Sequence, residues 1–256
     1  MSASLPPDIP SARAYFPRGM SQPASGFRFS MDALLLACFA PPGGATRVVD
    51  LGCGCGVVGQ GWMLRHPETV ATVTGLDVNQ QMLDCAVANA TRLGLEARYT
   101  VLRADVARLR DEPGVAPESC ELVLCNPPYR EPGTGRRPAD QGRDTARFGS
   151  KAPLPAFVAA ASALLKHRKR ACFIGLAARL PELLEQMGEH RLTPKRLLLV
   201  YSRVDEPARL ALVEAMKNGG LGLTVEPPLV LYRDRGEGSG LSPQALAFCP
   251  FLACNA

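Results

Sequence analysis

The sequence contains no hydrophobic run long enough to cross a bilayer, which takes roughly 20 consecutive apolar residues. Residues 1–11 are rich in proline and serine and include no apolar stretch, so we expect no signal peptide. Histidine is scarce, at three residues, and no two cysteines have the C-x-x-C spacing of a structural zinc site. These absences predict a protein with neither a membrane nor a metal among its partners.

Cysteine itself is not scarce, since the chain has nine. Without an export signal, we expect a cytoplasmic protein in a reducing compartment that keeps these thiols free. We interpret the cysteines as small apolar residues that fill strands and helices. The formal net charge of +5 weakly favours an anionic partner. We expect a monomer or a weak homodimer.

Short apolar segments alternate with helical patterns along most of the chain. Strands are expected at 47–51, 70–76, 98–103, 121–125, 171–176, 197–201 and 209–217. Helices are expected at 33–40, 57–66, 79–93, 154–165 and 179–189, with a short helix near the C-terminus. A strand followed by a helix, repeated about every thirty residues, is typical of a doubly wound, mostly parallel sheet. We therefore predict a Rossmann-like α/β fold with a seven-stranded sheet.

The segment 209–217 fits either a strand or a helix. We favour a strand antiparallel to 197–201, because Asn218-Gly219-Gly220 is turn chemistry and the sheet then has an antiparallel last strand. Residues 1–14 are expected to be a disordered tail, and 15–256 a single domain. Within that domain, 15–45 form a lead-in and a helix, and 46–256 form the sheet core with a C-terminal extension.

Three alternating glycines, Gly52, Gly54 and Gly56, follow the first expected strand. At the start of a helix, such glycines let the backbone approach a ligand closely. The spacing also formally matches the dinucleotide-binding pattern G-x-G-x-x-G, with Asp77 near the expected distance. Asp50, however, lies at the strand end, where a carboxylate would repel a pyrophosphate and suit a cation. This pattern favours a cationic adenosyl cofactor without phosphate, S-adenosylmethionine.

We expect the amino acid part of this cofactor over Asp50 and the glycine loop. Asp77, at the end of the second strand, would bind the ribose hydroxyls, and Asp105, after the third, the adenine amino group. The alternative is that these acids merely cap helices or turns. For Ser30 and Asp32, at the start of the first helix, a plain capping role and contact with the cofactor are equally consistent with the sequence.

The fourth strand ends abruptly at Asn126-Pro127-Pro128-Tyr129, because proline cannot donate a ladder hydrogen bond. The Asn126 side-chain oxygen and the Pro127 carbonyl can each accept one N–H of a planar amino group. That contact positions the nitrogen as a methyl acceptor and stabilises the charge that develops on it. Pro128 keeps the turn rigid, and Tyr129 offers a face on which a planar base can stack.

The loop after this turn has more cations than acids and contains glycines that give it mobility. We expect it to contact phosphates of a nucleic acid through Arg130, Arg136, Arg137, Arg143, Arg147 and Lys151. The alternative is a solvated loop with no partner. A second basic run, 166–170, precedes the fifth strand at the opposite edge of the sheet, and we interpret it as a solvated loop.

Several of these segments together resemble a known family. The run Val49 to Gly56 and Asn126 to Tyr129 resemble class I methyltransferases that act on amino nitrogens. The segments Phe27 to Ala37, Leu212 to Ala215 and Pro227 to Tyr232 are similar to bacterial tRNA (adenine-N6)-methyltransferases that modify valine tRNA beside the anticodon. The resemblance implies a class I methyltransferase fold, S-adenosylmethionine as cofactor, and methylation of the N6 amino group of adenine in tRNA.

Other branches with the same central motifs remain as alternatives. They methylate the N2 of guanine or the N6 of adenine in ribosomal RNA or DNA, or a glutamine of release factors. The protein-substrate alternative predicts a separate N-terminal recognition domain, whereas only about thirty residues precede the first helix. A non-enzymatic scaffold would predict loss of Asn126 or Asp77, and both are present.

Overall fold

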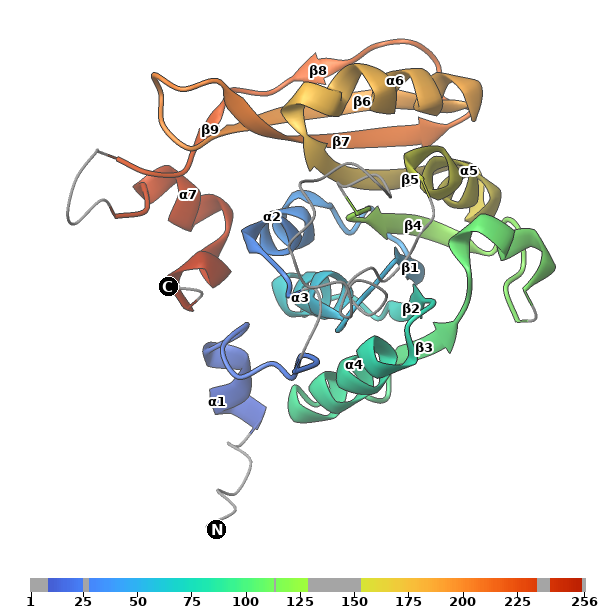
Figure 1. The fold of residues 1–256 in the computed structure, drawn as a ribbon, viewed down its shortest axis with the longest axis vertical. Coiled ribbons are helices and arrows are strands. Elements are labelled where there is room, and N and C mark those ends of the chain that lie inside the picture. Colours follow the sequence, from blue (N-terminus) through green and yellow to red (C-terminus); the bar gives the residue numbers. More distant parts are fainter. Residues whose placement is uncertain (1–8, 25–27, 113, 129–152, 234–239, 255–256) are drawn as a thin grey trace, which may run out of the picture.

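The computed structural model describes residues 9–24, 28–112, 114–128, 153–233 and 240–254. Within them, nine strands form one mixed sheet in the order β3-β2-β1-β4-β5-β7-β6-β8, with β9 paired to β6 (Figure 1). The strands are β1 (Arg47–Leu51), β2 (Thr72–Asp77), β3 (Tyr99–Arg103), β4 (Cys120–Cys125), β5 (Leu165–Leu176), β6 (Leu192–Tyr201), β7 (Ala208–Lys217), β8 (Thr224–Val225) and β9 (Leu229–Val230). The predicted Rossmann-like α/β sheet is confirmed.

Strand β1 lies in the middle of the parallel half, between β2 and β4. Leu51 pairs with Leu76 of β2 and with Cys125 of β4, so the three strands end at nearly the same level. The glycine loop, Asp77 and Asn126 each follow or terminate one of these strands. The topology therefore brings the predicted cofactor and acceptor residues to one edge of the sheet.

The antiparallel part of the sheet contains residues 209–217, whose sequence fits either a strand or a helix. Strand β7 runs antiparallel to both β5 and β6, so the predicted antiparallel last strand of the seven is confirmed. The sheet is wider than predicted, because β8 and β9 add two parallel neighbours to β6. Each has only two residues, too few for a hydrophobic pattern to reveal.

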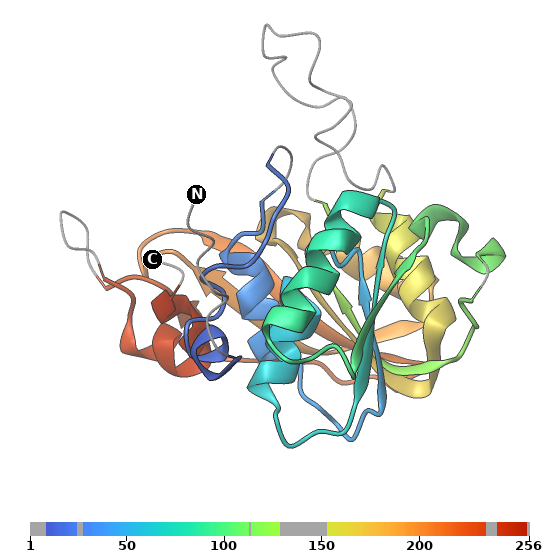
Figure 2. The same cartoon turned by 90° about the horizontal axis from the view of Figure 1, so that it is seen from below.

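Helices cover both faces of the sheet (Figure 2). They are α1 (Ile9–Ala14), α2 (Met31–Phe39), α3 (Val57–Arg65), α4 (Gln80–Arg92), α5 (Leu154–Leu164), α6 (Leu180–Glu189) and α7 (Pro243–Phe248). Leu34 of α2 and Trp62 of α3 belong to one hydrophobic cluster, and Phe157 of α5 and Leu183 of α6 to another. None of the described helices has the length and apolarity of a membrane span.

The expected disordered tail at 1–14 is wrong for its second half, because Ile9–Ala14 form α1. Arg13 fixes this helix by donating from Nε to the Leu93 carbonyl at 2.7 Å, at the C-terminal end of α4. Phe16, just beyond, is 1% exposed and packs edge-on against Phe251 at 4.9 Å between ring centroids. The N-terminal and C-terminal segments therefore pack together on the α2 face.

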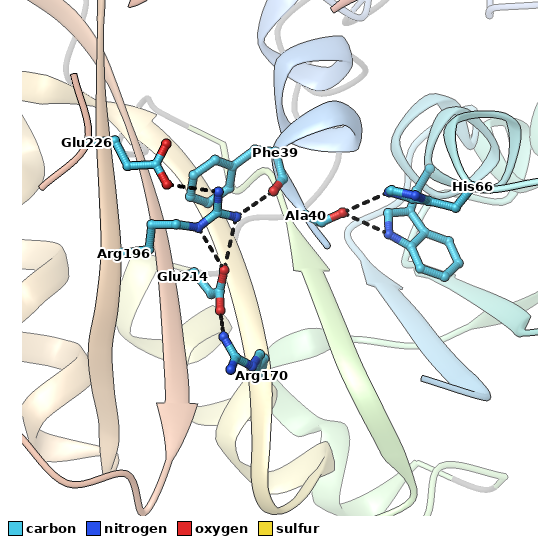
Figure 3. Close-up of polar contacts among 8 residues, drawn as sticks. Phe39, Ala40, His66, Arg170, Arg196, Glu214 and Glu226 are labelled. Carbon is cyan, nitrogen blue, oxygen red and sulfur yellow. Dashed lines mark hydrogen bonds and ion pairs between the residues drawn. The ribbon is translucent and has the colours of Figure 1, made fainter. Parts of the chain in front are cut away.

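The basic run 166–170 is also not the loop that was expected, since β5 begins at Leu165 and includes it. Lys166 pairs with Glu121 of β4, and Arg170 with Glu214 of β7. Figure 3 shows the second pair as part of a network in which Arg196 of β6 also binds Glu214. These ion pairs let a highly charged segment occupy a central strand position, which periodicity alone does not reveal.

Candidate functional site

The glycine loop turns the chain from β1 into α3 with three left-handed residues. Gly52, Gly54 and Gly56 have φ of 73°, 54° and 84°, a region that L side chains rarely adopt. The backbone N–H groups of Gly52 and Cys53 both donate to the Leu76 carbonyl, at 2.8 and 2.9 Å. The loop is therefore tied to the end of β2, and glycine is required for its conformation.

The glycine loop is tightly packed against the protein at Gly56 and open at Gly54. A side chain at Gly56 would begin 2.5 Å from Gln60 Nε2 and 2.9 Å from the buried hydroxyl of Tyr99. At Gly54, in contrast, no atom of the described residues other than Gly54 itself and its neighbours Cys53 and Cys55 lies within 4 Å of the position of a Cβ. A ligand can approach the backbone closely at Gly54, which fits the predicted cofactor site.

Asp77 ends β2 beside this loop and is 8% exposed. Its Oδ2 accepts a hydrogen bond from Gly54 N and its Oδ1 one from Asn79 N, both at 2.9 Å. Burial raises the pKa of this carboxyl, and the two N–H donors act in the opposite direction. The carboxylate is thus oriented at the loop, where binding of a ribose was predicted; that contact stays a prediction.

Asp50 lies beneath the loop, with 1% of its surface exposed. Its Oδ2 accepts a hydrogen bond from Gly59 N at 2.8 Å, in the first turn of α3. Burial raises the pKa of Asp50 to about 7, opposed by the Gly59 bond and assisted by repulsion from Asp77. The structure gives Asp50 the role of tying α3 to β1, and direct contact with a cofactor stays a prediction.

The remaining predicted cofactor residues surround the same edge. Asp105 Oδ1 accepts from Ala107 N at 2.9 Å, so it caps the turn after β3, as the alternative for this residue proposed. Ser30 occupies the N-cap position of α2 without a side-chain capping bond, and Asp32 lies in the first turn. The hydroxyl of Ser30 is thus not used as the plain cap that was one of its two expected roles.

Asn126 and Pro127 follow β4 directly beyond the pairing of Cys125 with Leu51. Asn126 is half-buried, Pro127 is buried and Pro128 is exposed. Residues 126–129 are called the acceptor turn below, and their first residues lie next to the glycine loop at the carboxyl ends of the parallel strands. Tyr129 and the predicted phosphate-binding residues lie outside the described residues; the latter are Arg130, Arg136, Arg137, Arg143, Arg147 and Lys151.

The charges fit S-adenosylmethionine, which carries an ammonium and a sulfonium. Asp50 and Asp77 are two buried carboxyl groups beside one loop, and burial makes ionisation costly and raises the pKa of both. Repulsion from Asp77 raises the pKa of Asp50 further. A cationic group over the loop would relieve that cost, whereas a pyrophosphate would increase it. In the described part of the chain, no cluster of three or more His, Cys, Asp or Glu could hold a metal ion.

Sequence reasoning missed one residue at this edge. Arg179 follows the carboxyl end of β5 and lines a small cavity together with Pro127 and Pro128. Its signal was available, because a cation directly after a parallel strand lies on the ligand-binding edge. We did not recognise Arg179 because the sequence pattern placed it in the first turn of the helix expected at 179–189.

Comparisons with known proteins indicate a methyltransferase. Residues 30–139 match the model of the methyltransferase small domain family. The tRNA1(Val) (adenine(37)-N6)-methyltransferase of Porphyromonas gingivalis is 26% identical over 211 residues, which cover 80% of each chain. The ribosomal RNA large subunit methyltransferase G of Psychromonas ingrahamii is 33% identical over 112 residues, 43% of this chain but 26% of that protein.

Among solved structures, a predicted O-methyltransferase from Agrobacterium tumefaciens superposes with a TM-score of 0.66. It is 26% identical in sequence, and the match covers 86% of this chain and 96% of that one. An O-methyltransferase family protein from Burkholderia thailandensis, at 14% identity and a TM-score of 0.52, shares the fold.

Proposed function

We propose that this chain, an S-adenosylmethionine-dependent methyltransferase, methylates the N6 amino group of adenine in tRNA. The proposed substrate is valine tRNA, and the proposed position is an adenine beside the anticodon. The observation that carries the proposal is the position of Asn126 and Pro127. They follow β4 at the level where the glycine loop follows β1, one strand away. Two hydrogen-bond acceptors therefore lie next to the place where the methyl donor fits.

The cofactor would be held by the glycine loop and by the acids around it. Gly54 leaves room at the backbone, and Asp77 presents an oriented carboxylate for two neighbouring hydroxyls. Asp105, which caps the turn after β3, would also accept from an adenine amino group in this proposal, and Ser30 and Asp32 lie at the start of α2. When bound, S-adenosylmethionine supplies an activated methyl group on its sulfonium.

The chain's own contribution to the chemistry is to hold the acceptor nitrogen. The amino group of adenine is a poor nucleophile because its lone pair is delocalised into the ring. The Asn126 side-chain oxygen and the Pro127 carbonyl each accept one N–H, which orients the nitrogen and favours its pyramidal form. Tyr129 would stack on the base, a contact worth about 1–3 kcal/mol per base. No residue with a pKa near 7 is needed to take a proton before transfer.

The nucleic acid assignment is supported by the relatives and by the charge of the chain. The Porphyromonas protein, whose name specifies tRNA and adenine N6, matches over most of both chains, whereas the ribosomal RNA enzyme matches over about a quarter of its own length. We further propose that Arg130, Arg136, Arg137, Arg143, Arg147 and Lys151 contact RNA phosphates. A base in an anticodon loop is already partly unpaired, so moving it into the site costs little.

Replacement of Asn126 tests the acceptor role. Asn126→Ala removes one acceptor of the amino group, so kcat is expected to fall roughly a hundred- to thousandfold. Affinity for S-adenosylmethionine, measured by calorimetry, should stay within about twofold because the glycine loop is intact. Asn126→Asp keeps an acceptor oxygen and should retain more activity than the alanine variant. An alanine variant with wild-type kcat would contradict the mechanism.

A further inference from the structure

A cavity of about 530 Å³ lies at the opposite edge of the sheet from the glycine loop and the acceptor turn. One of its residues, Arg170, pairs with Leu122 near the start of β4, and Leu122 pairs with Val48 near the start of β1. Other parts of its wall are the C-terminal end of α2 and residues of β6, β7 and β8. Small-molecule sites in proteins have volumes of roughly 300–1,000 Å³, so this amino-edge cavity is large enough for a ligand of its own.

Three cations from two strands line the amino-edge cavity. Lys195 and Arg196 are consecutive in β6, where successive side chains ordinarily point to opposite faces of the sheet. The pairing register of β6 with β7 shifts between Pro194 and Arg196, which makes Lys195 the extra residue of a bulge. A bulge changes the direction of the side chains beside it, so both cations line the cavity together with Arg170 of β5.

Carboxylates of the protein neutralise only part of this positive charge. Glu214 lines the cavity and pairs through one oxygen with Arg170 and through the other with Arg196 (Figure 3). Glu226 adds a second partner for Arg196 at 3.2 Å. Lys195 instead donates from Nζ to backbone carbonyls of the loop before β8, and the part of the chain that the structure describes gives it no carboxylate partner. The cavity therefore keeps a net positive charge that suits an anion.

The cavity also has an apolar wall at the end of α2. Cys38, Pro41 and Pro42 line it, and each of the three is partly exposed. A ligand with an apolar body can bury that body against these side chains, whereas a bare inorganic ion leaves them in contact with water. A phosphate monoester carries between one and two negative charges at neutral pH and has three acceptor oxygens, which matches a wall of several cations.

We propose that the amino-edge cavity binds a small organic phosphate, with the phosphate against Arg170 and Lys195 and the apolar part against Pro41 and Pro42. The inference goes beyond the proposed function and does not depend on which molecule accepts the methyl group. A concave site of this volume encloses a small molecule, whereas a polynucleotide needs an extended surface.

Lys169 offers a matched control, because it is the neighbour of Arg170 on β5. Ala171 and Phe173 of this strand pack in the cluster with α5 and α6, whereas Cys172 and Ile174 pack in the cluster with α2. By the same alternation, Lys169 lies on the α5 face and Arg170 on the α2 face, where the cavity is. The control therefore changes the net charge by the same amount on the other side of the sheet.

The test measures the binding of phenyl phosphate and of inorganic phosphate by calorimetry, with the full chain saturated with S-adenosylmethionine so that the cofactor site is filled. Phenyl phosphate should bind roughly tenfold more tightly than inorganic phosphate, because only its ring covers the apolar wall. Lys195→Gln should weaken the binding of phenyl phosphate roughly tenfold, the loss of one charged hydrogen bond. Lys195→Arg should recover part of that loss, and Lys169→Gln should stay within about twofold of wild type. The melting temperature checks that each variant is folded.

Three results would overturn the inference. The first is no binding of phenyl phosphate at millimolar concentrations, and the second is an equal loss in Lys195→Gln and Lys169→Gln, which indicates a general charge effect. The third is displacement of phenyl phosphate by tRNA with the same dependence on Lys195, which assigns the cavity to nucleic acid. Each of these results leaves the proposed methyl transfer standing, since none of these variants changes the glycine loop or the acceptor turn.

Discussion

Asp50 and Asp77 are two buried carboxylates beside a single glycine loop, and they differ in what they can reach. Asp77 accepts a hydrogen bond from Gly54 N and is 8% exposed, whereas Asp50 accepts one from Gly59 N and is 1% exposed. Asp50 ties the start of α3 to β1, whereas contact of either carboxyl group with the cofactor stays a prediction. The spacing of the residues predicted both carboxyl groups near the glycine loop, but not that Asp77 lies beside the loop and Asp50 beneath it.

The buried position of Asp50 predicts a pH dependence of stability. Its folded pKa of about 7 lies above the ordinary carboxyl value of 3.8 because of burial, so the folded state binds the proton more tightly than the unfolded state. The stabilisation of protonated Asp50 is therefore present at acidic pH and is lost as pH rises from about 4 to about 7. Relative to Asp50→Asn, the free energy of unfolding of wild type should fall across this window, by an amount on the order of a few kcal/mol.

Urea denaturation of both proteins between pH 4 and 8 measures this difference. The asparagine variant keeps an oxygen that can accept from Gly59 N, so it reports the titration rather than the loss of the bond. Parallel pH profiles for the two proteins would show that Asp50 ionises as an ordinary exposed carboxyl.

Among single residues, those with a special backbone or a fixed spacing were predictable and those defined by tertiary neighbours were not. Gly52, Gly54 and Gly56 were found by their alternation, because few other structures need that pattern. Arg179 was missed because it lines a cavity with Pro127 and Pro128. These prolines are about fifty residues earlier and become its neighbours only through the pairing of β4 with β5.

At the scale of elements, the C-terminal end of α2 is held by a charge network around the buried Glu214 (Figure 3). Arg196 of β6 donates from Nε to Glu214 at 3.0 Å and from Nη2 to the Phe39 carbonyl at 2.7 Å. Its guanidinium lies 3.9 Å from the centroid of the Phe39 ring, and Glu214 is 2% exposed. Ser30, a predicted cofactor residue, precedes α2, so this network would help to position that part of the proposed site.

Removal of one partner from this network should be costly. Arg196→Ala leaves the buried Glu214 with Arg170 alone and is expected to destabilise the protein by about 3–5 kcal/mol. The double variant Arg196→Met, Glu214→Leu should recover much of that loss, because the buried Glu214 carboxylate is removed together with its partner. Arg203→Ala breaks a pair that is partly exposed on both sides and should cost less, about 1 kcal/mol, in the same denaturation experiment. Similar losses for Arg196→Ala and Arg203→Ala would contradict this account.

Ion pairs and packing between distant segments explain where element prediction failed. The strand at 209–217 was recognised because its apolar residues and the following turn agree with a sheet that must close. The start of β5 was misplaced, since Lys166 and Arg170 look like loop residues until Glu121 and Glu214 are known to face them. Helix α1 was missed because it is short and depends on Arg13 and Phe16 packing against distant segments.

At the scale of the whole molecule, one edge of one sheet divides into two functional halves. The ends of β1, β2 and β3 present the glycine loop, Asp77 and Asp105, which suit a cationic nucleoside. The end of β4 leads into Asn126 and Pro127, where we propose that the amino group of the substrate binds. The fold brings the two halves together because β1 and β4 are neighbours, so the account predicts transfer from the first half to a nucleic acid base in the second.

Incubation with labelled S-adenosylmethionine and, separately, unmodified tRNA, ribosomal RNA, DNA and a release factor tests this account most directly. Digestion and mass spectrometry then identify the modified nucleoside or amino acid. The account predicts label in tRNA as N6-methyladenine, with valine tRNA preferred over other tRNAs, and loss of that label with Asn126→Ala. Label in glutamine of the release factor, or in guanine of ribosomal RNA with tRNA unlabelled, would contradict it.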